Sequence, residues 1–482
     1  MNRLARLLAV AVAAAWLCAA ASASRPGTPL QIGAVVPELA VRSLVGKTVE
    51  AMTGAGLGGA GRVTLTWRRG QKTLDPGLLS DLGYAIQQAD AAGIDIYLTV
   101  YPAGAADTPR TPGARATFAG WAASIVRRLP DLRHVIVGNE PNLNRFWLPQ
   151  FDRHGNDVAA PAYVQLLART YDAIKAVAPS VEVVGGALAH MGLNRPSALR
   201  DTQAPQRFLL DMGKAYRESG RKRPIMDAFA FHPYLEHSDL PPTYRHYSPR
   251  VITIADYGRL VSVLRRAFDG TGQRGSKLPI VYAEFGVESR IPAALLDSYT
   301  GLEPWTTRAV SEPVQARYYV KALQMAACQP TVRTFMVFRL IDEAALGGWQ
   351  SGLYYADGSP KSSLPAVEAA ARRLEERSPS GCATLLATRP RVSFFPVRRP
   401  TPRFPWLKPL SLLPDADCRY EVRLMKGSSL MVDVRGRALA GVRRRIGLTE
   451  ALLARGTYRI TIRVTATDFR ARPFTKSVVF SF

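Results

Sequence analysis

The chain has 482 residues, of which 47% are hydrophobic and 21% charged; this excludes a disordered or fibrous protein and leaves enough apolar material for a large core. Its 63 Lys and Arg residues against 38 Asp and Glu residues give a formal charge of +25. The charge is uneven, because residues 380–482 contain 20 basic and 6 acidic residues and so carry +14. Whether this surplus indicates a nucleic-acid partner depends on the compartment of the protein.

The first 23 residues have the pattern of a secretory signal peptide. Arg3 and Arg6 precede an apolar run over residues 7–20, and Ala21-Ser22-Ala23 provides the small residues of a cleavage site. The apolar run is short for a membrane anchor, and no later stretch is long enough to span a bilayer. We therefore expect a secreted protein, extracellular or associated with the cell envelope, without a transmembrane span after cleavage. This compartment argues against nucleic acid as the partner.

Three cysteines follow the expected leader: Cys328, Cys382 and Cys418. In an oxidising compartment Cys382 and Cys418 could pair, whereas Cys328 ends an amphipathic helix and is expected to be a buried free thiol. No Cys or His group has zinc-site spacing, and the six histidines are scattered. The sequence therefore predicts neither a metal site nor a cofactor.

Short runs rich in Val, Ile and Phe alternate with stretches of helical periodicity between about residues 29 and 376. The predicted strands are residues 31–36, 62–67, 95–101, 135–139, 182–187, 228–232, 280–284 and 334–338. The predicted helices include residues 78–92, 118–129, 163–178, 206–218, 254–268, 313–327 and 364–376.

Eight strands that alternate with helices predict an α/β fold with a parallel sheet, and a closed (β/α)8 barrel satisfies this count without a free edge. A doubly wound open sheet is the alternative, but it requires a glycine-rich phosphate loop directly after the first strand. Residues 37–39 are Pro-Glu-Leu instead. Residues 54–59 match G-x-G-x-x-G, yet they precede a strand rather than a helix, so we interpret them as a turn.

The C-terminal part of the chain has a different pattern. Residues 379–414 are dense in Pro and Arg and predict a linker, while strict alternation after that predicts a small all-β, immunoglobulin-like sandwich. The sandwich's basic surplus has two interpretations: it binds an anionic cell-surface polymer, or its arginines only solvate a structural domain packed on the barrel. The expected organisation is a signal peptide over 1–23, the barrel over 24–378, the linker over 379–414 and the sandwich over 415–482.

Carboxylates gather at the carboxyl ends of the predicted barrel strands, which is where such barrels carry their active sites. Glu140, within Asn139-Glu140-Pro141, ends the fourth strand, and Glu284 ends the seventh. Because these strands lie on different sides of the barrel mouth, their carboxylates can flank one bond, as glycoside hydrolysis requires. The other carboxylates near strand ends are Glu38, Glu288, Asp342 and Glu343.

These motifs resemble those of the clan A glycoside hydrolases, particularly families 5 and 39, which are TIM barrels of the cellulase type. His232-Pro233-Tyr234 on the sixth strand is similar to the clan's His-x-Tyr, and residues 352–361 resemble the segment after the eighth strand. The resemblance covers the barrel but not the last hundred residues. It implies that Glu140 is the acid/base, Glu284 the nucleophile, and that Asn139, His232 and Tyr234 line the substrate site, with Asn139 on the sugar 2-hydroxyl and Tyr234 holding the nucleophile.

The sequence departs from the clan's pattern at two places. An aromatic platform at the end of strand eight has no direct match, so Phe338 or Trp349 would have to serve. The arginine expected near the nucleophile late on strand two has no direct match either, since Arg62 begins that strand and Arg68 follows it. Trp67 and Trp349 are the favoured sugar-stacking residues, and Tyr101 and Trp147 are further candidates that could equally be core or rim residues.

Together, these features predict a secreted retaining β-glycoside hydrolase that cleaves O-glycosidic bonds of a β-linked oligo- or polysaccharide with two glutamates. One alternative is a transglycosidase, which uses the same carboxylates and differs only in the acceptor. Another is a glycan-binding or cell-envelope protein that kept the barrel without turnover, which intact Glu140 and Glu284 argue against.

Overall fold

The structure is a computed structural model, and it describes residues 29–197, 200–376, 379–393, 410–448 and 454–481. The expected signal peptide lies outside these residues. Within them, no helix has the length and apolar character needed to cross a membrane.

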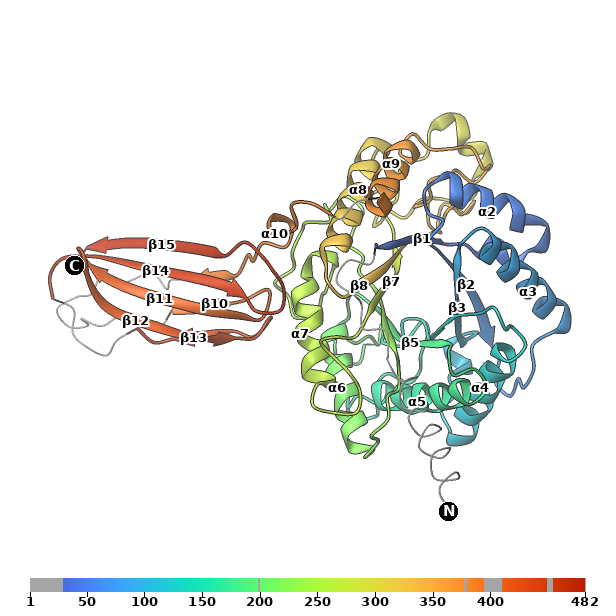
Figure 1. The fold of residues 1–482 in the computed structure, drawn as a ribbon, viewed down its shortest axis with the longest axis horizontal. Coiled ribbons are helices and arrows are strands. Elements are labelled where there is room, and N and C mark those ends of the chain that lie inside the picture. Colours follow the sequence, from blue (N-terminus) through green and yellow to red (C-terminus); the bar gives the residue numbers. More distant parts are fainter. Residues whose placement is uncertain (1–28, 198–199, 377–378, 394–409, 449–453, 482) are drawn as a thin grey trace, which may run out of the picture.

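The N-terminal unit is a closed barrel of parallel strands in chain order, surrounded by helices (Figure 1), which confirms the predicted fold class. In the described residues its strands are β1 (Gln31–Val35), β2 (Ala60–Trp67), β3 (Asp95–Pro102), β4 (His134–Val137), β5 (Glu182–Ala189), β6 (Ala228–His232), β7 (Ile280–Phe285) and β8 (Val332–Val337). Its α-helices are α2 (Val45–Gly54), α3 (Pro76–Ala91), α4 (Pro112–Val126), α5 (Ala159–Val177), α6 (Pro205–Glu218), α7 (Tyr257–Phe268), α8 (Glu312–Cys328) and α9 (Leu364–Glu376).

Side chains on each barrel strand alternate between the barrel interior and the helix layer, as the pleat of a strand requires. On β2, Ala60 belongs to the small interior cluster, whereas Val63 and Leu65 belong to the main core under the helices. Positions with the parity of Ala60 therefore face the barrel axis, and those nearest the carboxyl end face its mouth. The turn expected over residues 54–59 is present, since α2 ends at Gly54 and β2 begins at Ala60.

The C-terminal unit consists of two antiparallel sheets packed face to face, one with strand order β13-β10-β9 and the other with order β12-β11-β14-β15. The strands are β9 (Arg391–Ser393), β10 (Leu410–Leu413), β11 (Cys418–Lys426), β12 (Ser429–Ala438), β13 (Arg444–Ile446), β14 (Thr457–Ala466) and β15 (Phe474–Ser481). The expected sandwich is thus confirmed. Part of the expected linker over 379–414 forms structure, because the short helix α10 (Cys382–Leu385), β9 and β10 lie within it.

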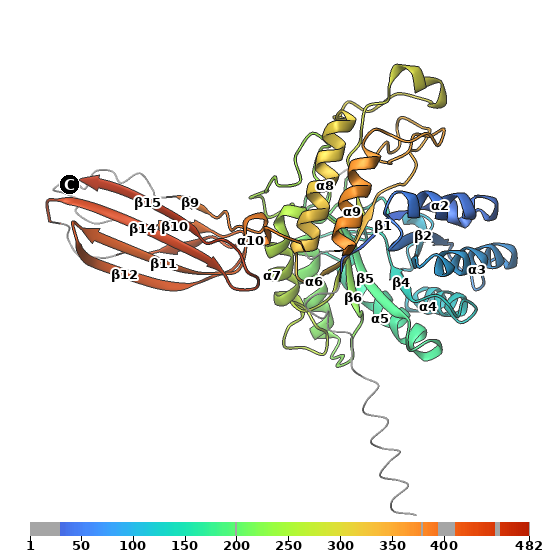
Figure 2. The same ribbon diagram turned by 45° about the horizontal axis from the view of Figure 1, so that its top comes forward.

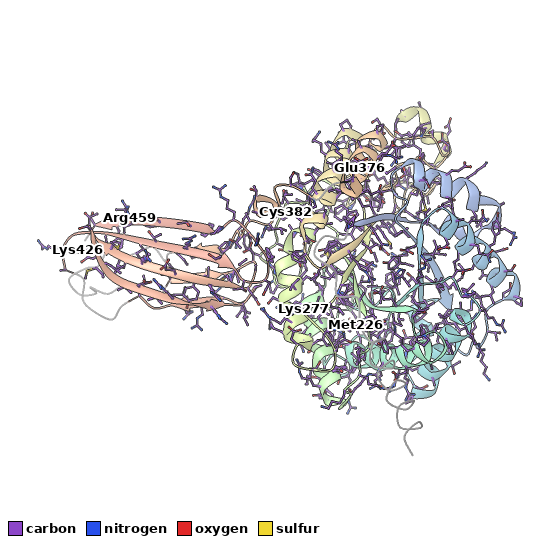
Figure 3. The ribbon with its side chains drawn as sticks, in the orientation of Figure 1. Met226, Lys277, Glu376, Cys382, Lys426 and Arg459 are labelled. Atoms are coloured by element: carbon purple, nitrogen blue, oxygen red, sulfur yellow. A yellow bond between two sulfur atoms is a disulfide. The ribbon has the colours of Figure 1, made fainter. Side chains whose placement is uncertain are left out.

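A disulfide and several ion pairs attach the sandwich to the barrel. Cys382 of α10 is bonded to Cys328 at the end of α8, and Cys418 is a buried free thiol, so both cysteine predictions were wrong. The reason lies in the fold: α10 packs on α8, whereas Cys418 starts a strand whose buried face closes the sandwich core. Figure 3 shows Cys382 at the junction of the two units.

The acidic residues at the start of β11 complete this junction. Asp417 is paired with Arg265 of α7 and accepts a hydrogen bond from Ser262 at 2.7 Å, and Asp415 is paired with Arg245. Asp468 pairs with the same Arg265 at 2.9 Å. The sandwich therefore extends from the α7–α8 side of the barrel as an attached unit (Figures 1 and 2).

Candidate active site

Two glutamates and a histidine meet at the carboxyl ends of β4, β6 and β7. One carboxylate oxygen of Glu140, one of Glu284 and a ring nitrogen of His232 all lie within 4.8 Å of one another. Both glutamate side chains are largely buried, with exposed fractions of 16% for Glu140 and 11% for Glu284. The fold thus brings together the carboxylate pair that was predicted from the strand ends.

The backbone around Glu140 is held in an uncommon conformation. Glu140 has φ 42°, a left-handed value that residues with a side chain rarely adopt, and Gly138 has φ 100°. A Cβ atom on Gly138 would lie 2.9 Å from the Tyr163 ring, so this position accepts only glycine. Tyr163 in turn donates to the Val137 carbonyl at 2.6 Å. Helix α5 therefore fixes the turn that directs Glu140 into the mouth.

A register irregularity in β7 directs Glu284. Pairing between β7 and β8 shifts between Tyr282 and Phe285, and Ala283 already faces the barrel interior. Simple alternation would place Glu284 in the helix layer, but the shift allows two successive side chains to face inward. β-Bulges of this kind often lie beside active sites, where they re-aim a side chain.

Both oxygens of Glu284 have donors. Oε1 is paired with the Arg62 guanidinium, and Oε2 accepts a hydrogen bond from the Tyr234 hydroxyl at 2.9 Å. Burial alone would raise the pKa of Glu284, but the charges of His232 and Arg62, with the hydrogen bonds from Arg62 and Tyr234, outweigh it and hold this pKa below its usual range. Glu284 is therefore an ionised carboxylate at neutral pH, which is the state a nucleophile needs.

His232 lies between the two glutamates. Its Nδ1 is 3.0 Å from Glu140 Oε1 and 3.5 Å from Glu284 Oε2, and its side chain has no exposed surface. The sequence predicts His232 among the substrate-binding residues. It is fully buried and contacts both carboxylates, and the Tyr234 hydroxyl donates to Glu284, the contact that the resemblance implied.

Arg62 is the site residue that sequence reasoning failed to place. Its Nη2 donates to Asn139 Oδ1 at 2.8 Å and its Nε to Thr99 Oγ1 at 2.7 Å, while Nη1 contacts Glu284. Arg62 is only 2% exposed. It shares the parity of Ala60, so its side chain rises through the barrel interior from low on β2 to the mouth. Two sequence features could have identified Arg62 as a site residue: its parity on the strand, and the presence of a charged residue within an apolar strand.

If Glu284 is the nucleophile that the resemblance implies, replacing Arg62 by Met should lower kcat/KM by roughly 100-fold, because the buried cation that orients this carboxylate is lost. The Arg62 charge lowers the pKa of Glu284, so its removal raises that pKa and the acidic limb of the kcat/KM profile moves to higher pH. Arg68→Met is the matched control, since Arg68 is exposed just beyond β2. Unchanged acidic limbs in both variants would contradict this role for Arg62; rates on an aryl β-glycoside across pH provide the measurement.

Of the four aromatic residues considered for sugar stacking, two are buried in the core and two lie at the mouth. Trp67 is fully buried, packs edge-on against Phe118 of α4 and donates to the Gln71 carbonyl at 2.8 Å, so its placement as a sugar-stacking residue was wrong. Trp67 has the parity of Val63, which directs it to the helix layer. Trp147 is likewise a core residue, 2% exposed.

Trp349 does lie at the site. Its half-buried ring is 5.2 Å from that of Tyr234 and 5.0 Å from that of Phe338, measured between centroids. Tyr101, also half-buried, lies at the end of β3; burial raises its pKa, and the charge of Arg62 only partly opposes this. Trp349 and Tyr101 therefore lie on two different sides of the mouth.

The remaining carboxylates have other partners. Asp342 is buried against Lys361 and Tyr299, and Glu343 is paired with Arg339. Burial raises the pKa of Glu288 to about 7. Asp342, Glu343 and Glu288 are therefore not part of the carboxylate pair. Glu38, whose pKa is raised by burial, lies near Arg339 at the edge of the mouth and is not part of the pair either.

Glu140, His232 and Glu284 also form a grouping whose atoms could ligate a metal ion. However, both Glu284 oxygens already accept hydrogen bonds, and one of the donors is the Arg62 guanidinium. Because the positive Arg62 guanidinium already lies beside Glu284, electrostatic repulsion disfavours a metal cation at the same carboxylate. The chemistry of the trio fits proton transfer and nucleophilic attack better than metal binding.

No protein-family model matches the chain, and no curated protein does. Solved structures similar to it include a beta-glucuronidase of Bacteroides uniformis (13% identity, TM-score 0.44, 95% of this chain and 46% of that one). Others are a GH5_18 protein of Streptomyces cattleya in complex with GlcNAc (16%, TM-score 0.49, 74% and 82%) and a glucosidase of Croceicoccus marinus (12%, TM-score 0.48, 88% and 96%). The chain thus spans less than half of the beta-glucuronidase. At these identities and TM-scores the likeness does not bear on reaction or substrate.

Proposed function

We propose that the protein is a retaining β-glycoside hydrolase in which Glu284 is the nucleophile and Glu140 the acid/base. The observation that carries this proposal is the carboxylate pair at the mouth, with oxygens within 4.8 Å and with unequal environments. Glu284 is held ionised by Arg62 and Tyr234, whereas Glu140 contacts His232 and has no arginine partner among the described residues. Two carboxylates with different environments are suited to different roles.

In the first step, a Glu284 oxygen attacks the anomeric carbon and the bond from that carbon to the glycosidic oxygen breaks. Glu140 gives its proton to the departing oxygen, which leaves as an alcohol. Arg62 and Tyr234 hold the attacking carboxylate in position, so little reorganisation accompanies the reaction. The product is a glycosyl ester on Glu284.

In the second step, Glu140 is a carboxylate and removes a proton from water, which attacks the same anomeric carbon. The ester bond breaks and Glu284 is released as a carboxylate. Two displacements at one carbon retain its configuration. Carboxyl groups about 5–5.5 Å apart are typical of retaining enzymes and about 6.5–9.5 Å apart of inverting ones, and an oxygen of Glu140 within 4.8 Å of one of Glu284 is compatible with the retaining spacing.

A transglycosidase would form the same ester and pass the sugar to a second glycan instead of water. Hydrolysis is the version we propose, with a β-linked oligo- or polysaccharide as substrate and its degradation outside the cell as the role. Secretion is part of this proposal and rests on the pattern of the first 23 residues. A glycan-binding protein without turnover would not need a nucleophile kept ionised by a buried arginine.

The test uses a panel of activated 2-deoxy-2-fluoro β-glycosides, with peptide mapping by mass spectrometry. The expected result is stoichiometric inactivation by at least one sugar and an adduct on Glu284, because the fluorine slows the second step more than the first. An adduct on another residue would overturn the nucleophile assignment. If no sugar labels the protein and no aryl β-glycoside is cleaved, the protein is a binder; added acceptor glycans separate hydrolysis from transfer.

A further inference from the structure

The outward face of the four-stranded sheet of the sandwich is rich in arginine. Residues that alternate with the buried Tyr420, Val422 and Leu424 point away from the core. The exposed arginines with this parity are Arg419 and Arg423 on β11, Arg435 and Arg437 on β12, and Arg459 and Arg463 on β14. We call these six residues the arginine face; Arg459 lies toward the end that is far from the barrel (Figure 3).

The few acids of the C-terminal unit are distributed so that the charge of this face is only partly neutralised. Asp415, Asp417 and Asp468 pair with barrel arginines at the junction, away from the face. On the face itself, Glu421 and Asp433 both pair with Arg423 and Arg435. Among the residues that the structure describes, Arg419, Arg437, Arg459 and Arg463 have no ion pair.

Three of the four unpaired arginines, Arg419, Arg437 and Arg463, line a common hollow. A depression of about 520 Å³ is lined by Arg419, Arg437, Arg463 and Thr465, by the paired Glu421 and Arg435, and by Gly436 and Tyr420, whose side chain belongs to the sandwich core. A second depression of about 430 Å³ adjoins it, since Glu421 and Arg463 line both, and it adds the hydroxyl groups of Thr461 and Thr475. The two depressions therefore form one continuous strip across the strands.

The register places two of these arginines against each other. Arg419 lies directly opposite Arg437 in the pairing of β11 with β12, and its other neighbour is Thr465 of β14. Like charges in directly opposed positions destabilise a sheet. Their juxtaposition costs the free protein stability, and a bound anion between them would relieve the repulsion.

We propose that the arginine face binds an acidic polysaccharide, through carboxylate or sulfate groups spaced along the chain. Guanidinium groups match carboxylates with paired hydrogen bonds, and the threonine hydroxyls suit sugar hydroxyls. Single-stranded nucleic acid is disfavoured, because the described outward-facing residues of this sheet include no aromatic ring on which bases could stack. The choice of a glycan rests on the proposed function of the barrel, to which the face is firmly attached.

The test compares Arg419→Gln/Arg437→Gln with Arg444→Gln/Arg445→Gln in the full chain. The second pair removes the same charge from exposed positions on β13, which belongs to the other sheet. Affinity for polygalacturonate is measured by calorimetry at two salt concentrations, with neutral glucan and single-stranded DNA as comparison probes. We expect at least tenfold weaker binding and a smaller salt dependence for the face variant, and less than twofold change for the control.

Folding and catalysis provide independent readouts. The face variant removes a like-charge pair, so its melting temperature should equal or exceed that of the wild type, and its rate on a small aryl glycoside should be unchanged. Equal loss of affinity in both variants, absence of binding to polygalacturonate, or tighter binding of DNA would each overturn the proposal. Because binding is measured without turnover, failure of the proposed hydrolase activity would leave this result interpretable.

Discussion

Replacing Glu284 by Gly is expected to abolish turnover of aryl β-glycosides, with a fall in kcat of about 10⁴-fold or more, because the carboxylate proposed to attack the anomeric carbon is lost. Added azide should restore cleavage by entering the space of the missing side chain. The product would be a glycosyl azide of inverted configuration, since only one displacement occurs. Rates and the NMR assignment of the azide product provide the measurement.

Glu288→Gly is the matched control for this experiment. Glu288 is a buried glutamate four residues further along the chain, and burial raises its pKa to about 7, but it lies outside the carboxylate pair. Its removal should change kcat only a few-fold and should not make turnover depend on azide. A Glu284→Gly variant with more than a tenth of the normal rate would rule out Glu284 as the nucleophile.

Replacing Glu140 by Ala should produce a loss that depends on the leaving group. A dinitrophenolate leaves without a proton, so the first step is spared and a burst of product should precede slow turnover. For a poor leaving group such as a sugar alcohol, both steps need Glu140 and kcat should fall by about 10²–10⁴-fold. Stopped-flow and steady-state rates over a series of aryl glycosides would separate the two cases.

Azide distinguishes the two glutamates. In the Glu140→Ala variant it should attack the ester on Glu284 without base assistance, and the product would keep the configuration of the substrate. If the Glu140 variant instead gave the inverted azide, the roles of Glu140 and Glu284 would have to be exchanged. A loss that is equal for all leaving groups would show that Glu140 acts on structure rather than on proton transfer.

The barrel could be predicted from sequence because its strands are continuous apolar runs and its helices have clear periodicity. The carboxylate pair could be predicted because strand order alone brings the ends of β4 and β7 to one mouth. Strand ends were accurate to a few residues; β5 extends to Ala189, two residues beyond its predicted end. Helix α2, Val45–Gly54, was absent from the predicted helices.

The features that could not be predicted depend on the direction of single side chains and on long-range packing. Arg62 and Trp67 lie on the same strand with opposite parity, and their predicted importance was reversed because they were judged by their position along the strand and not by the side to which each points. The inward direction of Glu284 depends on a register irregularity with β8 that no local pattern records. The Cys328–Cys382 bond depends on the packing of α10 against α8, which is a long-range contact.

The left-handed backbone at Glu140 has a consequence for how this chain can change. A residue with a side chain held at φ 42° destabilises the folded state by roughly 1 kcal/mol relative to glycine. Selection for stability alone would therefore favour Glu140→Gly, the substitution that deletes the proposed proton donor. If the proposal holds, a glutamate at position 140 marks a lineage still under selection for chemistry, and descendants freed from that selection would be expected to lose this residue early.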